Sequence, residues 1–183
     1  MELVSGFKYK LILENEEIFT PCINKLPNVV DLPELFDISE FHTKEDGDEL
    51  TVSGNMTSKW NYDSTDRIDG FVTLYRYERR EWVATLYSMT VKDVCSVIYD
   101  DKQYWYELWT KHIISSKNVR ENCLMSGTKF IYEPFVVDIH IDIKAVVPLG
   151  RNKFVIYLKA FDKDLNVRDP TLCLEIVGDV IRL

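Results

Sequence analysis

The chain contains four cysteines, Cys22, Cys95, Cys123 and Cys173. None of them forms a C-x-x-C pair, so the spacing argues against a zinc ribbon or a thioredoxin-type redox site. Nothing in the neighbouring sequence marks one thiol as activated for nucleophilic catalysis. Two hypotheses remain, namely buried free thiols or two disulfides, which four cysteines can form in three ways.

Among these pairings, Cys22–Cys173 and Cys95–Cys123 are favoured. The first would tie the N-terminal region to the last expected strand, and the second would close a loop around an expected helical segment. In the chain-entropy description these loops stabilise the fold by roughly 5 and roughly 3.5 kcal/mol before any strain. Because disulfides persist in oxidising compartments, this pairing predicts a secreted protein.

Asp138, His140 and Asp142 alternate along one segment and are the best candidates for a metal site or an acid–base cluster. Side chains two residues apart on a strand are roughly 6–7 Å apart, so they reach one ion only with bending or outside ligands. The favoured interpretation is therefore a solvated outer face of a strand, with no metal and no other cofactor.

The remaining histidines, His42 and His112, have no serine or cysteine beside them in a recognised catalytic arrangement. The sequence also has no G-x-S-x-G elbow, no H-E-x-x-H motif and no phosphate-binding loop. We therefore predict that the protein is not an enzyme. The catalytic alternative is a lipid hydrolase that depends on His112 or His140.

Asn55-Met56-Thr57 is an N-glycosylation sequon. Leu50, Val52 and Met56 fall on one parity of the surrounding segment, whereas Asn55 and Thr57 fall on the other. A strand would therefore present Asn55 to solvent, and we expect a glycan there.

Charge and hydropathy limit the possible partners. The formal net charge is −8, which repels nucleic acid, and Lys117, Arg120 and Lys129 are too scattered in sequence to form a basic patch. No apolar run approaches the roughly 20 residues of a membrane span. Residues 1–5 lack the basic and apolar regions of a signal peptide, so we expect either a cytosolic protein or a processed, secreted one.

Alternation of apolar and polar residues dominates the rest of the chain and predicts a mostly β, antiparallel cup or sandwich of about eight strands. Residues 43–49 are expected to form a charged turn. Residues 21–36, which contain three prolines, are expected to form a connector with a turn of helix near Leu35. We expect one domain, residues 1–183. The expected strands include 7–13, 49–60, 67–78, 81–89, 135–145, 153–161 and 171–182.

One helical insertion is expected near residues 90–116, where Trp105, Leu108 and Trp109 recur at helical spacing. The aromatic run in this insertion either packs on the sheet or forms a gate over an apolar cavity. In the second case Trp105 and Trp109 would lie at the rim. Strand parity predicts that the cavity is lined by Val52, Met56, Val72, Leu74, Trp82, Leu86, Val137, Ile139, Ile141, Phe154, Ile156 and Leu158.

An ordered series of short segments resembles the fly chemosensory B (CheB) proteins, which are similar to the lysosomal ganglioside activator protein. The resemblance covers roughly residues 7–181. Its segments are Trp-Val-Ala-Thr-Leu-Tyr at 82–87, Val94-Cys95, Gln103-Tyr104-Trp105-Tyr106, Trp109-Thr110-Lys111, Asn122-Cys123, Glu133-Pro134-Phe135 after Gly127, Gly150-Arg151-Asn152-Lys153-Phe154, and Cys173-Leu174-Glu175-Ile176-Val177-Gly178.

This resemblance implies a secreted lipid-recognition protein with a β-cup fold. It implies an association with gustatory hairs and with responses to cuticular-hydrocarbon pheromones, degenerin-type sodium channels as downstream receptors, and transient contact with a membrane surface. It also supports the two cysteine pairs, although this chain has fewer cysteines than the activator protein. The expected function is a carrier or presenter of a lipid or hydrocarbon. The alternative is a secreted interaction module that modulates a receptor or channel without a bound lipid.

Overall fold

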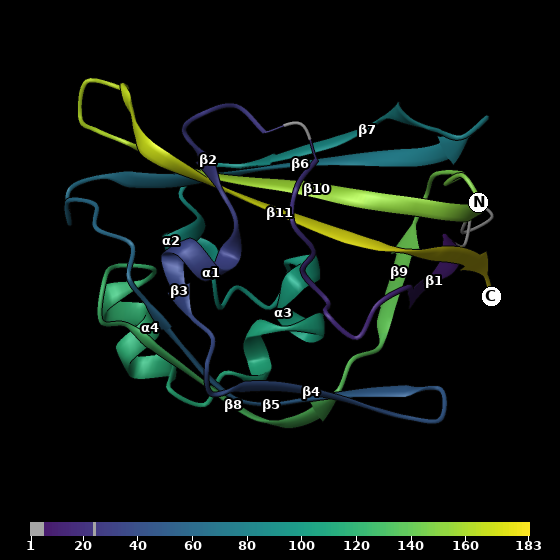
Figure 1. The fold of residues 1–183 in the computed structure, drawn as a ribbon, viewed down its shortest axis with the longest axis horizontal. Coiled ribbons are helices and arrows are strands. Elements are labelled where there is room, and N and C mark those ends of the chain that lie inside the picture. Colours follow the sequence, from purple (N-terminus) through teal and green to yellow (C-terminus); the bar gives the residue numbers. More distant parts are fainter. Residues whose placement is uncertain (1–5, 24) are drawn as a thin grey trace, which may run out of the picture.

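The computed structural model describes residues 6–23 and 25–183. Residues 1–5, where the sequence shows no signal peptide, lie outside the described residues. Within the described part the chain forms eleven strands and a few short helices, so the protein is mostly β and antiparallel, as predicted. The strands form two sheets, which are stacked in Figure 1.

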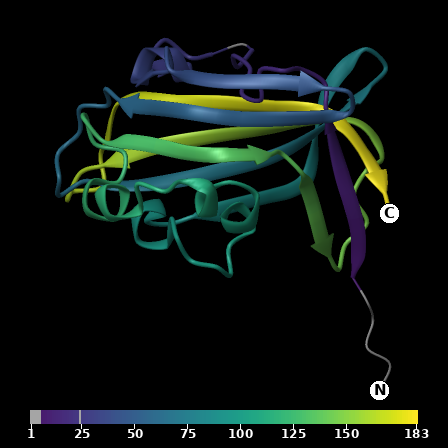
Figure 2. The same ribbon diagram turned by 90° about the horizontal axis from the view of Figure 1, so that it is seen from below.

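The larger sheet, here called the large sheet, is curled into a half-barrel. At one edge of this sheet, β1 (Phe7–Leu13) and β9 (Ile139–Ile143) turn steeply away from the other strands (Figure 2). A two-residue strand, β2 (Val29–Val30), lies parallel to β11. The order across the sheet is β7 (Glu81–Val91), β6 (Arg67–Glu78), β10 (Gly150–Phe161), β11 (Val167–Arg182), β1 (Phe7–Leu13) and β9 (Ile139–Ile143).

The second sheet, here called the small sheet, is built around β5 (Glu49–Ser58). Strand β8 (Lys129–Val136) pairs with one edge of β5, and β4 (Phe41–Asp46) and β3 (Phe36–Asp37) pair with it elsewhere. Residues 43–46 are therefore strand, and the prediction of a charged turn over 43–49 was wrong for them. The turn is confined to Gly47 and its neighbours, where the positive φ of 63° suits glycine.

The predicted long strand over 135–145 is also wrong, because it is two strands in different sheets. Strand β8 ends at Val136 in the small sheet, and β9 begins at Ile139 in the large sheet. Between them the Val137 N–H still donates to the carbonyl of Leu50 in the small sheet. The period of two continues through this corner, so alternation alone could not reveal it.

The helical insertion is a set of short helices. They line one long side of the space between the sheets, and α1 (Leu32–Leu35) lies on the opposite side (Figure 2). The insertion is interrupted at Asp100, whose carboxylate accepts hydrogen bonds from the Lys102 N–H and the Gln103 side chain. No helix in the described ranges is long and apolar enough to cross a membrane. The helices are α2 (Val94–Val97), α3 (Tyr104–Leu108), the 3₁₀ helix η1 (Thr110–His112) and α4 (Ser116–Asn122).

All four cysteines are described, and they form the two favoured disulfides, Cys22–Cys173 and Cys95–Cys123. The first joins the segment after β1 to β11, and the second joins α2 to the end of α4. Bonds of this kind are typical of proteins that fold in oxidising compartments.

Candidate functional site

The candidate site lies on the face of the large sheet that looks toward the small sheet, here called the inner face. Residues of both sheets meet in one buried cluster, which includes Ile68 and Leu172 from the large sheet and Val52 and Phe130 from the small sheet. Pairing across the large sheet places even-numbered residues of β6, β10 and β11 on this face, together with odd-numbered residues of β7, β1 and β9.

One end of the inner face is filled by aromatic packing around Trp109. Its ring lies edge-on to Phe19 and Phe135, with centroids 5.1 and 5.7 Å away. Its indole N–H donates to the Tyr132 hydroxyl at 3.2 Å. Burial raises the pKa of Tyr132 well above its usual range, although this hydrogen bond acts in the opposite direction. This end is a packed core.

The other end is capped by residues 144–149, the connection from β9 to β10. The Tyr9 hydroxyl donates to the Ala145 carbonyl and accepts from the Val147 N–H, at 3.2 and 3.1 Å. The Tyr87 hydroxyl donates to the Val146 carbonyl. These bonds hold the loop across the sheet from β1 to β7, over a second buried cluster that contains Leu74.

Between the two ends, a row of apolar side chains crosses the inner face and stays partly exposed. We call Met89, Val72, Ile156 and Leu174 the apolar row. They are neighbours on consecutive strands, since Met89 pairs with Val72, Val72 with Ile156, and Ile156 with Leu174. All four are only partly buried, and Leu174 also packs against the cluster at the Trp109 end. Side chains on the facing sides of two stacked sheets usually fill the space between them, so this incomplete coverage is informative.

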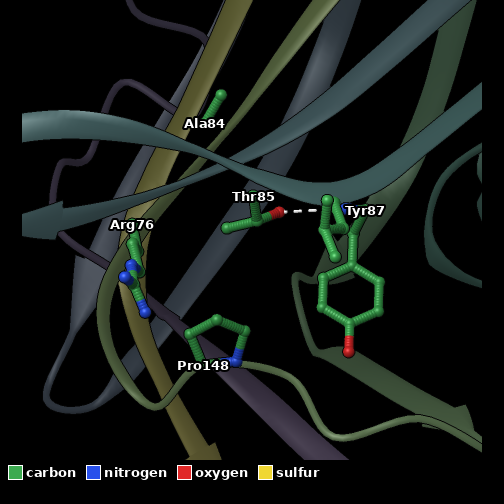
Figure 3. A pocket seen from close by; sticks show the side chains of 6 residues that line it. Arg76, Ala84, Thr85, Tyr87 and Pro148 are labelled. Carbon is green, nitrogen blue, oxygen red and sulfur yellow. Dashed lines mark hydrogen bonds between the residues drawn. The ribbon is translucent and has the colours of Figure 1, made fainter.

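A hollow of about 410 Å³ lies along the same face, at its β6–β7 edge. Figure 3 shows Arg76, Thr85, Tyr87 and Pro148 around it, with the Tyr87 N–H donating to the Thr85 hydroxyl. Tyr87, which lines the hollow, lies two residues before Met89 on β7. Its volume is within the range of small-molecule sites.

The structure brings many predicted lining residues onto the inner face but leaves only some of them open. Val52, Met56, Val137 and Leu158 belong to the packed cluster at the Trp109 end. Leu74, Ile139 and Phe154 belong to the cluster under the 144–149 loop. Val72, Ile141 and Ile156 lie on the inner face in neither cluster and are partly exposed.

Two predicted lining residues on β7 lie elsewhere, and this is a correction. Arg79 and Arg80, both with positive φ, form a two-residue turn that pairs Glu78 with Glu81 and Tyr77 with Trp82. Even residues of β6 therefore share a face with odd residues of β7. Trp82 accordingly lies on the outer face. Leu86 is fully exposed, in an irregular stretch of β7.

The same register identifies inner-face residues that were not predicted from the sequence. Tyr87 and Met89 belong beside Leu74 and Val72. The hairpin tip from Glu78 to Glu81 could have revealed them in the sequence. A two-residue turn fixes which residues of the two strands it joins lie on the same face of the sheet.

The two tryptophans of the helical insertion also differ from the predicted rim. Trp109 is inside the aromatic cluster. Trp105, one turn earlier on α3, has a buried indole nitrogen that finds no hydrogen-bond partner among the described residues.

Charged residues on and beside β9 form an exposed patch. His140 Nδ1 is 3.0 Å from an Asp138 carboxylate oxygen, and Lys10 lies 3.3 Å from the same carboxylate. Over the described ranges, no three His, Cys, Asp or Glu side chains are grouped closely enough to hold a metal ion. On β5 the predicted parity is confirmed, with Met56 buried and Asn55 partly exposed.

Compared with known proteins, the chain matches no family model and no curated protein.

Proposed function

We propose that this protein is a secreted carrier that holds an apolar ligand against the inner face of the large sheet. The observation that carries the proposal is the apolar row. Val72 and Ile156 are on central strands, with hydrogen-bonded neighbours on both sides, yet their side chains remain partly exposed. A ligand along this row would complete the burial that the protein leaves incomplete.

The energetics suit a ligand with a long apolar part. Burying apolar surface yields about 25 cal/mol per Å², from which the loss of translational freedom must be subtracted. The row runs from β7 to β11 with no charged side chain among its four members. Affinity would therefore follow the apolar length of the ligand, and binding rather than catalysis is the role that we assign.

Secretion is part of the proposal and is supported by the two disulfides and by the sequon at Asn55. The resemblance to the CheB proteins extends the proposal to chemosensory detection of a lipid or hydrocarbon, with a degenerin-type sodium channel as a downstream partner. That extension rests on the resemblance alone.

Displacement of a fluorescent apolar probe, N-phenyl-1-naphthylamine, tests the carrier role. The Met89→Arg variant introduces a charge at the edge of the apolar row and should weaken probe binding at least tenfold. The matched variant Ser88→Arg adds the same charge to the exposed neighbour on the outer face and should leave binding unchanged. Equal loss in both variants, or no binding by the wild type after lipid extraction, would contradict the proposal and favour an interaction module.

A further inference from the structure

We infer that the ligand carries a hydrogen-bond acceptor, and that Trp105 Nε1 donates to it. This inference deepens the proposed function and rests on it. It narrows the ligand class from any apolar molecule to an oxygenated one, such as a long-chain ketone, ester or acid. A pure hydrocarbon does not belong to this class.

The first observation is the unpaired indole. Trp105 Nε1 is inaccessible to solvent and has no hydrogen-bond partner within the described residues. The indole N–H can only donate. Leaving such a donor buried and unpaired costs about 1–3 kcal/mol, and buried Trp N–H groups usually find an acceptor.

The second observation is the contrast with Trp109, which lies four residues later. Trp109 donates its own N–H to Tyr132 and packs among Phe19, Phe41 and Phe135 in the packed cluster between the sheets. Trp109 lies just past the end of α3, and its backbone N–H donates to the Trp105 carbonyl at 2.9 Å, so the two residues are one turn of chain apart.

The third observation places Trp105 near the open part of the inner face. Helix α3 lies against β9, the strand that carries Ile141. Trp105 is absent from the buried clusters of the described residues, whereas Trp109 packs against one. The unpaired donor therefore lies outside the aromatic core, on a helix that contacts the strand carrying Ile141.

An acceptor on the ligand would satisfy this donor. An oxygen of a ketone, ester or carboxylate can accept the hydrogen bond while the rest of the chain lies along the apolar row. A site that provides a buried donor discriminates against a ligand that lacks the matching acceptor, because the donor then stays unpaired. Trp105 would thus determine specificity, and the apolar row would supply most of the affinity.

The test compares hexadecane with 2-hexadecanone and 8-hexadecanone, delivered from cyclodextrin in competition with N-phenyl-1-naphthylamine. The Trp105→Phe variant keeps an aromatic ring and removes the donor. This variant should bind about tenfold more weakly to whichever ketone the wild type binds more tightly. Its affinity for hexadecane should change less than twofold. The matched variant Trp82→Phe, on the outer face, should change neither. Near-ultraviolet circular dichroism and urea midpoints confirm that each variant is folded.

The outcomes separate the two proposals. If the wild type binds none of the probes, the carrier role fails. If the probes bind but Trp105→Phe weakens ketone and alkane equally, or leaves the ketones unchanged, the acceptor inference fails while the carrier role stands.

Discussion

Strand β10 presents two faces that are covered in different ways. On the outer face Val155 is buried, and Lys153 forms a buried ion pair with Glu175 at 2.9 Å. On the inner face Phe154 and Ile156 are only partly buried, although they belong to the same central strand.

Around Val155 the outer face is covered by the chain itself. The segment after β1 crosses β11, where Cys22 bonds to Cys173 and the Ile23 N–H donates to the Glu175 carboxylate. Val29 completes this cluster. This part of the outer face thus gains its cover from a covalently fixed segment, while the described residues cover the centre of the inner face only in part. Stability and binding are therefore expected to depend on opposite faces of one strand.

The largest expected effect comes from the ion pair on the outer face. Lys153→Met leaves the Glu175 carboxylate buried without its cation and should lower the free energy of unfolding by about 3–5 kcal/mol. Urea unfolding measures this loss. Replacing both partners, with Lys153→Met and Glu175→Leu, should recover much of it.

An exposed pair provides the control. Arg76 and Glu78 are 2.7 Å apart and about half exposed, so Arg76→Met should cost less than about 1 kcal/mol. If Lys153→Met cost no more than Arg76→Met, the outer face would not be sealed as described.

A smaller effect compares the two faces of β10 directly, through the stability cost of truncating one side chain on each face. Val155→Ala removes two carbons from a buried site and should cost about 2 kcal/mol, including the cavity that remains. Ile156→Ala removes three carbons from a partly exposed site and should cost less than about 1 kcal/mol. The order of the two urea midpoints is decisive, because a larger loss in Ile156→Ala would mean that the inner face is fully packed.

A pH-dependent effect concerns the packed end of the interior. Burial raises the pKa of Tyr62 to about 12, despite the hydrogen bond that its hydroxyl accepts from the Leu124 N–H. Because the pKa of Tyr62 is higher in the folded state than in the unfolded state, the contribution of its protonated hydroxyl to stability is complete below pH 10. That contribution is lost as pH rises toward 12. The free energy of unfolding should therefore fall over this range, and less steeply in Tyr62→Phe. Parallel pH profiles of the two proteins would contradict this.

Much of the fold followed from the sequence because local patterns determined it. The predicted strands at 67–78 and 7–13 match β6 and β1 in both bounds, and the cysteine pairing was correct. The break between Val136 and Ile139 could not be predicted, because a strand that changes sheets keeps its alternation. The coverage of Ile156 was also unpredictable, because it depends on distant segments.

The site was harder to predict than the fold. Trp82 was assigned to the wrong face because both parities of β7 are apolar, and only the turn at Arg79 and Arg80 resolves them. The unpaired nitrogen of Trp105 depends on three-dimensional packing, and the sequence distinguishes it in no way from Trp109.

The most direct test of the carrier account is paramagnetic broadening of isoleucine methyl signals by 16-doxyl-stearic acid, a spin-labelled fatty acid. The account predicts that the Ile156 and Ile141 methyl signals broaden first, at substoichiometric to equimolar ligand. Ile12 and Ile181 are more exposed but lie on the outer face, and their signals should persist. Broadening of Ile12 and Ile181 before Ile156, or no selective broadening at all, would contradict binding at the inner face.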